Sequence, residues 1–316
     1  MAEGEKGFIS DPARGGTIQE ALEELDQLER AVAAYHELGE EQHLVRAYNA
    51  LGLAYARREE WKPALGNYDQ ALRLAQRTDD LRGAAVTFRN LGDASRARGY
   101  PSTSVQCYEE ALKLMAQLGD EPGVAELCNG LGVFHAEAGQ WERAVEVLQR
   151  ALQIHTRLGD SGGLMDVYNN LGNVYALQGE WERAAEFYRL DLEVSEQAKH
   201  PGSVAKTCNN LGIACVRLGQ GRRALEYYQR AAQTYEQLAD IYGMSSTWAN
   251  MGLLYLQAGH PDEAKPLLAN AILVLSKLKH PDAQAAAKGL AQACGSVEAA
   301  NEYLNATSNH PEGGAR

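Results

Sequence analysis

Cysteine and proline are scarce in this sequence, which has five and nine of them in 316 residues. None of the cysteines forms a C-x-x-C pair, and most fall in segments with helical periodicity, as small buried side chains do. Structural disulfides and zinc sites are therefore not expected. The opening residues, MAEGEKGFISDPARGG, lack the basic and apolar regions of a signal peptide. Because no segment reaches the roughly 18 apolar residues of a membrane span, we expect a cytoplasmic protein.

Positive charge is also in deficit. The sequence has 30 Lys and Arg against 42 Asp and Glu, a formal net charge of -12, with a pI of about 5.2. Such a surface repels phosphate backbones and has no attraction for anionic membranes. Nucleic acid and the membrane surface are therefore excluded as general partners.

No set of residues typical of catalysis or metal binding is present. The eight histidines form no H-E-x-x-H pattern. His135 occupies a position that other repeats fill with tyrosine, so we expect a packed core histidine. The segment GQGRRA at 219–224 fits a dinucleotide-binding spacing but follows a helix instead of a strand. We predict that the protein is not an enzyme and takes no cofactor and no metal.

What the sequence does have is an internal repeat of 40 residues. Leu-Gly recurs at 51–52, 91–92, 131–132, 171–172 and 211–212, and Met251-Gly252 continues the series. In the fourth copy Tyr168, Leu171, Gly172 and Tyr175 are spaced as i, i+3, i+4 and i+7, which places them on one helix face. The pattern predicts a first helix, helix A, with a packed face in every repeat.

A second helix, helix B, follows in each repeat. Small residues stand twelve positions after the glycine, tyrosine or leucine comes four residues later, and alanine comes three after that. Asp191 breaks the last row, and the sequence leaves open whether it is an ion-pair partner or a local loosening. The Leu-Gly-Asp turns supply Asp120 and Asp160 as expected N-caps of the next helix.

These residues together resemble the tetratricopeptide repeat (TPR), whose usual period is 34 residues. The 40-residue period is similar to that of the Pins/LGN adaptors and, more distantly, of kinesin light chains. HEAT and armadillo repeats share the period but lack the Leu-Gly and alanine pattern. The resemblance implies an all-α, right-handed α-solenoid of antiparallel helix pairs, the TPR superhelix, with a concave peptide-binding groove.

The same pattern predicts the organisation of the chain. We expect a flexible tail over 1–16, a capping helix over 17–40 and six repeats over 41–280, beginning at 41, 81, 121, 161, 201 and 241. Capping helices over 281–304 and a flexible tail over 305–316 complete the chain.

Asparagines recur in helix A although they are poor helix formers. At 100° per residue, Asn49, Asn129, Asn169 and Asn209 are predicted to face the groove, as is Asn173 one turn after Asn169. Amides offer donors and acceptors together, so this row is a candidate grip on a peptide backbone. Asn170 and its equivalents, the second row, are predicted to make hydrogen bonds between repeats. The alternative is that the amides of both rows only satisfy one another.

Charged residues on the same face are candidates for specificity, namely Arg46, Arg89, Lys206 and Arg217. The alternative is ion pairing between repeats, which contributes little. The clamp by which some TPR domains bind acidic C-termini is not expected, because Asn169 and Ser246 stand where lysines are needed.

We therefore predict a scaffold that binds a protein or peptide partner in the groove. The alternative is a regulatory or sensor module whose ligand changes the superhelix or the oligomeric state. Self-association is compatible with either function, and the C-terminal tail could also occupy the groove.

Overall fold

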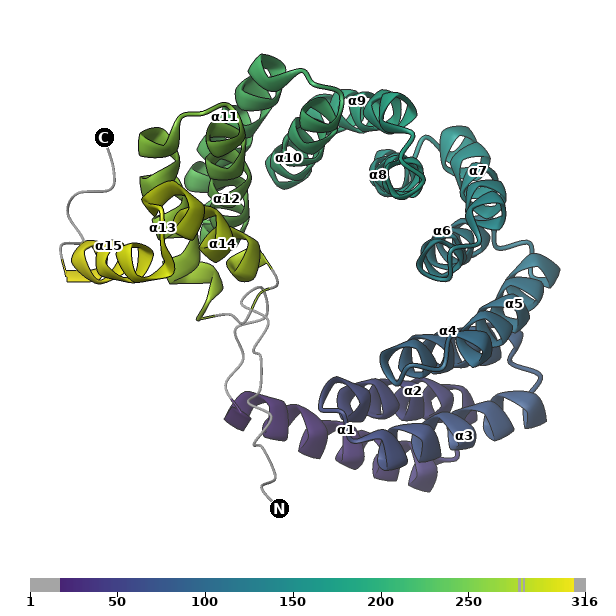
Figure 1. Ribbon diagram of the computed structural model, residues 1–316. Helices are drawn as coiled ribbons and strands as arrows, with labels where there is room; N and C mark the ends of the chain where they lie inside the picture. The colour runs from purple at the N-terminus through teal and green to yellow at the C-terminus, as the bar shows by residue number, and fades with distance from the viewer. Residues whose placement is uncertain (1–17, 278–279, 281, 310–316) are drawn as a thin grey trace. The chain divides into compact units, whose positions relative to one another are not determined.

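The computed structural model describes residues 18–277, 280 and 282–309, and every element in this part of the chain is an α-helix (Figure 1). The all-α class with tandem antiparallel helix pairs is thus confirmed. The expected tails over 1–16 and 310–316 lie outside the described residues. The expectation of a tail from residue 305 is wrong for 305–309, because this segment continues the last helix to Asn309.

The chain divides into two compact units, which meet in sequence at Gly159 and Asp160. The helices of unit 1 are α1 (Ile18–Leu38), α2 (Glu41–Arg57), α3 (Trp61–Arg77), α4 (Leu81–Ala97), α5 (Pro101–Gln117), α6 (Glu121–Glu137) and α7 (Trp141–Leu158). Those of unit 2 are α8 (Ser161–Leu177), α9 (Trp181–Gln197), α10 (Pro201–Arg217), α11 (Gly221–Gln237), α12 (Ile241–Gln257), α13 (Pro261–Leu275), α14 (Asp282–Cys294) and α15 (Val297–Asn309).

Short turns with a left-handed residue end these helices. Positive φ values recur at every twentieth residue from Gly39 to Gly259, and glycine occupies most of these positions. Asp120 and Asp160 cap the following helices by accepting hydrogen bonds from the backbone N–H of Gly123 and Gly163, both at 3.1 Å, which confirms the predicted N-caps.

Helices A and B of a repeat meet at the Leu-Gly pair. Gly172 on α8 lies against the ring of Tyr188 on α9, which is 4 % exposed, and Gly52 lies in the same way against Tyr68. Where helix B has leucine instead, as at Leu148, that side chain covers the glycine. His135 is buried, as the sequence predicts.

The A helices of each unit share one side and the B helices the other. In unit 1, α4 and α6 lie on one side and α5 and α7 on the other; in unit 2, α8 and α10 are separated from α9 and α11 in the same way (Figure 1). The predicted site is therefore expected on the surface of the A helices that faces away from the B helices.

Candidate functional site

The first asparagine row is part of the packing between repeats. Asn49 is 5 % exposed, and its Nδ2 donates to Thr87 Oγ1 at 2.9 Å and to the Val45 carbonyl at 3.2 Å. Its Oδ1 accepts from Asn90 Nδ2 at 3.3 Å. The amide thus joins α2 to α4, with both its donor and its acceptor used inside the protein.

Unit 2 repeats this arrangement between α10 and α12. Asn209 Oδ1 accepts from Asn250 Nδ2 at 3.1 Å and from Thr247 Oγ1 at 3.3 Å. The prediction that the second row makes hydrogen bonds between repeats is confirmed for Asn90 and Asn250.

The predicted orientation of Asn49 and Asn169 toward an open groove is wrong, since their side chains are 5 % and 4 % exposed. The predicted directions assume that the buried face of helix A is centred on the side that packs against helix B. Neighbouring A helices also pack against one another, so the buried sector extends over the direction of these asparagines. Asn129 and Asn209 are half-buried.

Repeat four departs from this pattern through Asp191. This carboxylate on α9 is 2 % exposed and accepts from Ser195 Oγ at 3.1 Å and from Thr207 Oγ1 at 2.5 Å. Burial raises the pKa of Asp191, while the bonds from Thr207 and Ser195 and the charge of Lys206 act in the opposite direction. Asp191 is therefore a buried hydrogen-bond acceptor. Because Thr207 is turned toward it, the Nδ2 of Asn169 faces Asp191 without a regular hydrogen bond.

Asn173 belongs to a second internal contact. Its Oδ1 accepts from Tyr188 Oη at 2.7 Å, as the carboxylate of Asp93 accepts from Tyr108 Oη at 2.7 Å in unit 1. Leu53 stands at the equivalent position of the first repeat, and the buried hydroxyl of Tyr68 has no partner within the described residues. Asn173 and Asp93 are thus explained as acceptors for the hydroxyl group of the helix B tyrosine.

This difference predicts opposite responses to one substitution. Tyr108→Phe is expected to destabilise the protein by about 1–2 kcal/mol, because it removes a hydrogen bond to a carboxylate. Tyr68→Phe is expected to be neutral or stabilising, because its hydroxyl is buried unpaired, and burial raises the pKa of Tyr68 to about 12. Urea unfolding midpoints of both variants would check this, and equal losses would contradict it.

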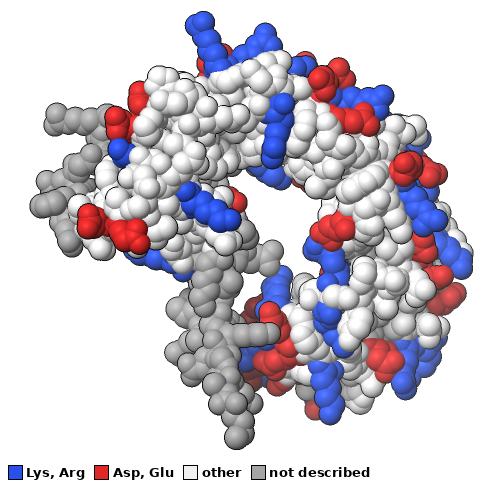
Figure 2. All heavy atoms as spheres, in the orientation of Figure 1, with Lys and Arg blue, Asp and Glu red and all other residues white. Residues whose placement is uncertain are grey.

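The predicted specificity residues separate into paired and exposed cations. Arg89 on α4 lies 3.4 Å from the Glu126 carboxylate on α6, and Arg96 lies 3.2 Å from Glu137. The alternative of ion pairing between repeats is thus confirmed for Arg89. Cationic and anionic side chains are interspersed over unit 1 on the face that Figure 2 shows.

Exposed cations gather along α10. Lys206 and Arg217 are both exposed, and Asn210 and Ile213 are half-buried between them, at the spacing i, i+4, i+7 and i+11. We call these four residues the α10 stripe. The Arg217 guanidinium lies over the Trp181 ring, 5.5 Å from its centroid.

Asn210 is a further candidate contact residue, although its place in the second row predicts a hydrogen bond between repeats. Its equivalents Asn90 and Asn250 donate to asparagines of the preceding repeat, but Asn169 Oδ1 accepts instead from Asn173 Nδ2 at 3.4 Å. Within the described residues the half-buried amide of Asn210 makes no side-chain hydrogen bond, so its donors and its acceptor are not used inside the protein. In the sequence, this difference between repeats is marked by Asp191, which stands at a position that the other repeats fill with alanine.

Unit 1 has a matching set on α2, the α2 stripe, formed by Arg46, Ala50, Leu53 and Arg57. Arg46 is exposed, Leu53 is 36 % exposed, and Arg57 lies 3.7 Å from the Glu24 carboxylate on α1. The order of cation, small or amide side chain, apolar side chain and cation is the same as on α10.

The described residues include buried thiols but lack the cluster of side chains that a metal site requires. Burial raises the pKa of four thiols and so favours their protonated form: Cys107, Cys128, Cys208 and Cys215. In the described part of the chain no three His, Cys, Asp or Glu side chains gather to hold a metal ion. No helix there is long and apolar enough to cross a membrane.

Comparison with known proteins gives the family. Residues 17–270 match the MalT-like TPR region, and residues 250–313 match a tetratricopeptide repeat family. No curated protein matches the chain. The structure of BtubC from P. vanneervenii is similar, with 24% identity, a TM-score of 0.64 and coverage of 71% of this chain and 93% of that chain.

Two further structures share the fold. RapI in its apo form has 20% identity and a TM-score of 0.67, covering 84% of this chain and 96% of its own. A Signal Transduction ATPase with Numerous Domains (STAND) protein with a tetratricopeptide repeat sensor, from Pyrococcus horikoshii, has 15% identity and a TM-score of 0.63. That match covers 92% of this chain and 47% of the STAND protein. At these identities the likenesses establish the fold alone.

Proposed function

The chain belongs to the MalT-like TPR family, and from this premise we propose that it is a cytoplasmic, non-enzymatic interaction module that binds a peptide segment of a partner protein on its A helices. The proposed likeness to the Pins/LGN adaptors concerns the 40-residue length of the repeat. Adaptor function is inferred from the exposed side chains and is not carried over from those proteins.

The α10 stripe is the observation that carries the proposal. Lys206 and Arg217 are separated by about 16 Å along the helix, the length of about five residues of extended peptide. Ile213 and the unpaired amide of Asn210 lie between them. In a protein with a net charge of -12, such a stripe favours a peptide with acidic residues on both sides of an apolar one.

The α2 stripe supports the proposal independently, within unit 1. It repeats the two cations and the apolar residue, with Ala50 in place of the amide. We infer that each unit has its own peptide-binding face. The predicted roles of Arg46, Lys206 and Arg217 are kept, and Asn210 takes the amide role that the sequence analysis gave to the first row.

The test uses peptides selected from a random display library on the intact protein. We expect the selected peptides to be acidic, and Lys206→Glu combined with Arg217→Glu to weaken them at least about tenfold, because two charge-assisted contacts become repulsive. Arg183→Glu combined with Arg222→Glu makes the same charge change on the B helices α9 and α11 and should leave affinity within about twofold.

Unchanged affinity in the α10 variant, with its circular dichroism intact, would contradict the proposal. Equal weakening in both double variants would show that net charge alone governs binding, and would contradict it as well.

A sensor module is the second candidate, because the STAND protein's repeats are described as a sensor. Light scattering with and without a selected peptide separates the two functions. A change of oligomeric state with the peptide would favour the sensor, and a constant state would favour the scaffold.

A further inference from the structure

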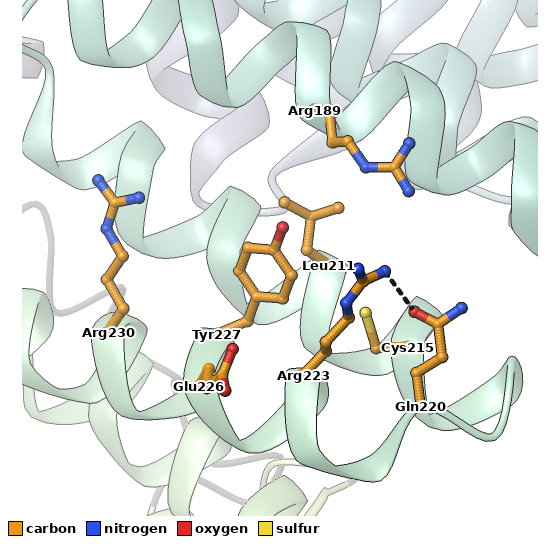
Figure 3. Close-up of a pocket in the computed structure, with 8 residues that line it drawn as sticks. All are labelled: Arg189, Leu211, Cys215, Gln220, Arg223, Glu226, Tyr227 and Arg230. Atoms are coloured by element: carbon orange, nitrogen blue, oxygen red, sulfur yellow. Dashed lines mark hydrogen bonds between the residues drawn. The ribbon is translucent and has the colours of Figure 1, made fainter.

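A crevice on the other side of unit 2 is formed by α9 and α11, with α10 beneath it (Figure 3). It has a volume of about 530 Å³, within the range of small-molecule sites. Leu211 and Cys215 on α10 and the ring of Tyr227 on α11 give it an apolar floor. Arg189 reaches in from α9, and Arg223 and Arg230 from α11.

In the part of the chain that the structure describes, two of these three arginines form no ion pair with a carboxylate. Arg230 is paired with Glu196 at 2.5 Å, and the one acidic residue of the lining, Glu226, is paired with Arg222 at 3.6 Å. Within the described residues, Arg189 and Arg223 form no ion pair; Arg223 Nη1 donates only to Gln220 Oε1 at 3.3 Å. Two guanidinium groups are thus left uncompensated at one crevice of an acidic protein.

The repeats show that this pair of cations is specific to one crevice. Arg143, the equivalent of Arg223 two repeats earlier, makes the same hydrogen bond to Gln140, at 3.5 Å. The residue equivalent to Arg189 in that repeat is Glu109, so an acidic residue stands there in place of the second arginine. Duplication alone therefore does not account for two cations here.

The charges of Arg189 and Arg223 both act on Cys215, at the floor of the crevice. The Cys215 thiol is 5 % exposed, and burial raises its pKa, while Arg189 and Arg223 both act to lower it. Their positive potential therefore converges on the floor of the crevice. An anion bound above this sulfur would compensate both charges.

We propose that this crevice binds a small organic phosphate, with Arg189 and Arg223 contacting the phosphate oxygens and Leu211 and Tyr227 contacting the organic part. Arginine suits this role because its planar fork matches phosphate oxygens in bidentate geometry. The cavity volume is ample for an organic group beside the phosphate. The site uses B-helix arginines and lies apart from the α10 stripe, so it stands or falls independently of peptide binding.

The experiment is calorimetric titration of the intact protein with phenyl phosphate in a phosphate-free buffer. We expect saturable binding, weakened at least about tenfold by Arg189→Gln combined with Arg223→Gln, which removes two charge-assisted contacts. Arg143→Gln is the matched control and should leave the dissociation constant within about twofold. All these arginines are exposed, and unfolding midpoints should therefore stay close to wild type.

The same titration is repeated with inorganic phosphate and with phenol, which each carry one part of phenyl phosphate. Weaker binding of both, compared with phenyl phosphate, is expected if charge and apolar floor act together. Inorganic phosphate binding as tightly as phenyl phosphate would overturn the assignment of an organic ligand. Absence of saturable binding, or equal losses in the Arg143 variant, would overturn the site itself.

Discussion

Replacing Gly172 by alanine is expected to destabilise unit 2 by about 1–3 kcal/mol, a large effect for one added methyl group. A Cβ atom at this position would lie 2.4 Å from Cε1 of Tyr188, which real contacts do not allow. The ring is buried and its hydroxyl is bonded to Asn173 at 2.7 Å, so it cannot swing aside without losing that bond. The helices α8 and α9 must therefore separate.

Gly66→Ala on α3 is the control for this prediction. Nothing lies within 4 Å of a Cβ atom at Gly66, and the helical backbone there accepts alanine. We expect a gain of up to about 1 kcal/mol, because alanine loses less conformational entropy in a helix. Thermal unfolding midpoints would check both changes. A loss at Gly66 equal to that at Gly172 would contradict the steric explanation.

The pH dependence of stability is expected to change when Asp191 becomes asparagine. In the folded protein burial raises the pKa of Asp191 above 3.8, the ordinary value of an aspartate side chain. Between 3.8 and the folded pKa the native state binds more protons than the unfolded state, so this group makes stability fall as pH rises through that window. Asp191→Asn removes the titration and should remove this fall.

Urea midpoints of wild type and Asp191→Asn, measured from about pH 4 to pH 8, would test the sign. We expect the difference to grow in favour of the variant as pH rises and then to level off above the folded pKa. Asp69→Asn is the control, since Asp69 is exposed and forms a surface ion pair with Arg73 at 3.0 Å. A difference that grows as pH falls would contradict the prediction.

Much of the fold could be predicted from the sequence because its determinants are local. The 40-residue period of Leu-Gly, the tyrosines of helix B and the capping aspartates each act within one helix pair. Asp120 and Asp160 cap the expected helices, and Gly172 lies on the face of helix A that the spacing predicts to be packed. The contact of the helix A glycine with a tyrosine or leucine of helix B recurs in all six repeats, and an aspartate caps helix A in four of them.

The directions of the asparagines could not be predicted in the same way. A helical wheel fixes the angle between Asn169 and Tyr168, but the width of the buried sector depends on how closely the next A helix packs. The structure extends that sector over Asn49 and Asn169. It also shows that a single residue on α9, Asp191, redirects Thr207.

The TPR fold can be derived from the sequence, because a repeat specifies its own helix pair through residues a few turns apart. Which polar side chains remain available to a ligand follows from the packing of the repeats, because hydrogen bonds and ion pairs between repeats join residues about 40 positions apart. Those contacts occupy the amide of Asn49 and the charge of Arg89. The side chains of Asn210, on one side of unit 2, and of Arg189 and Arg223, on the other, are not used in such contacts within the described residues.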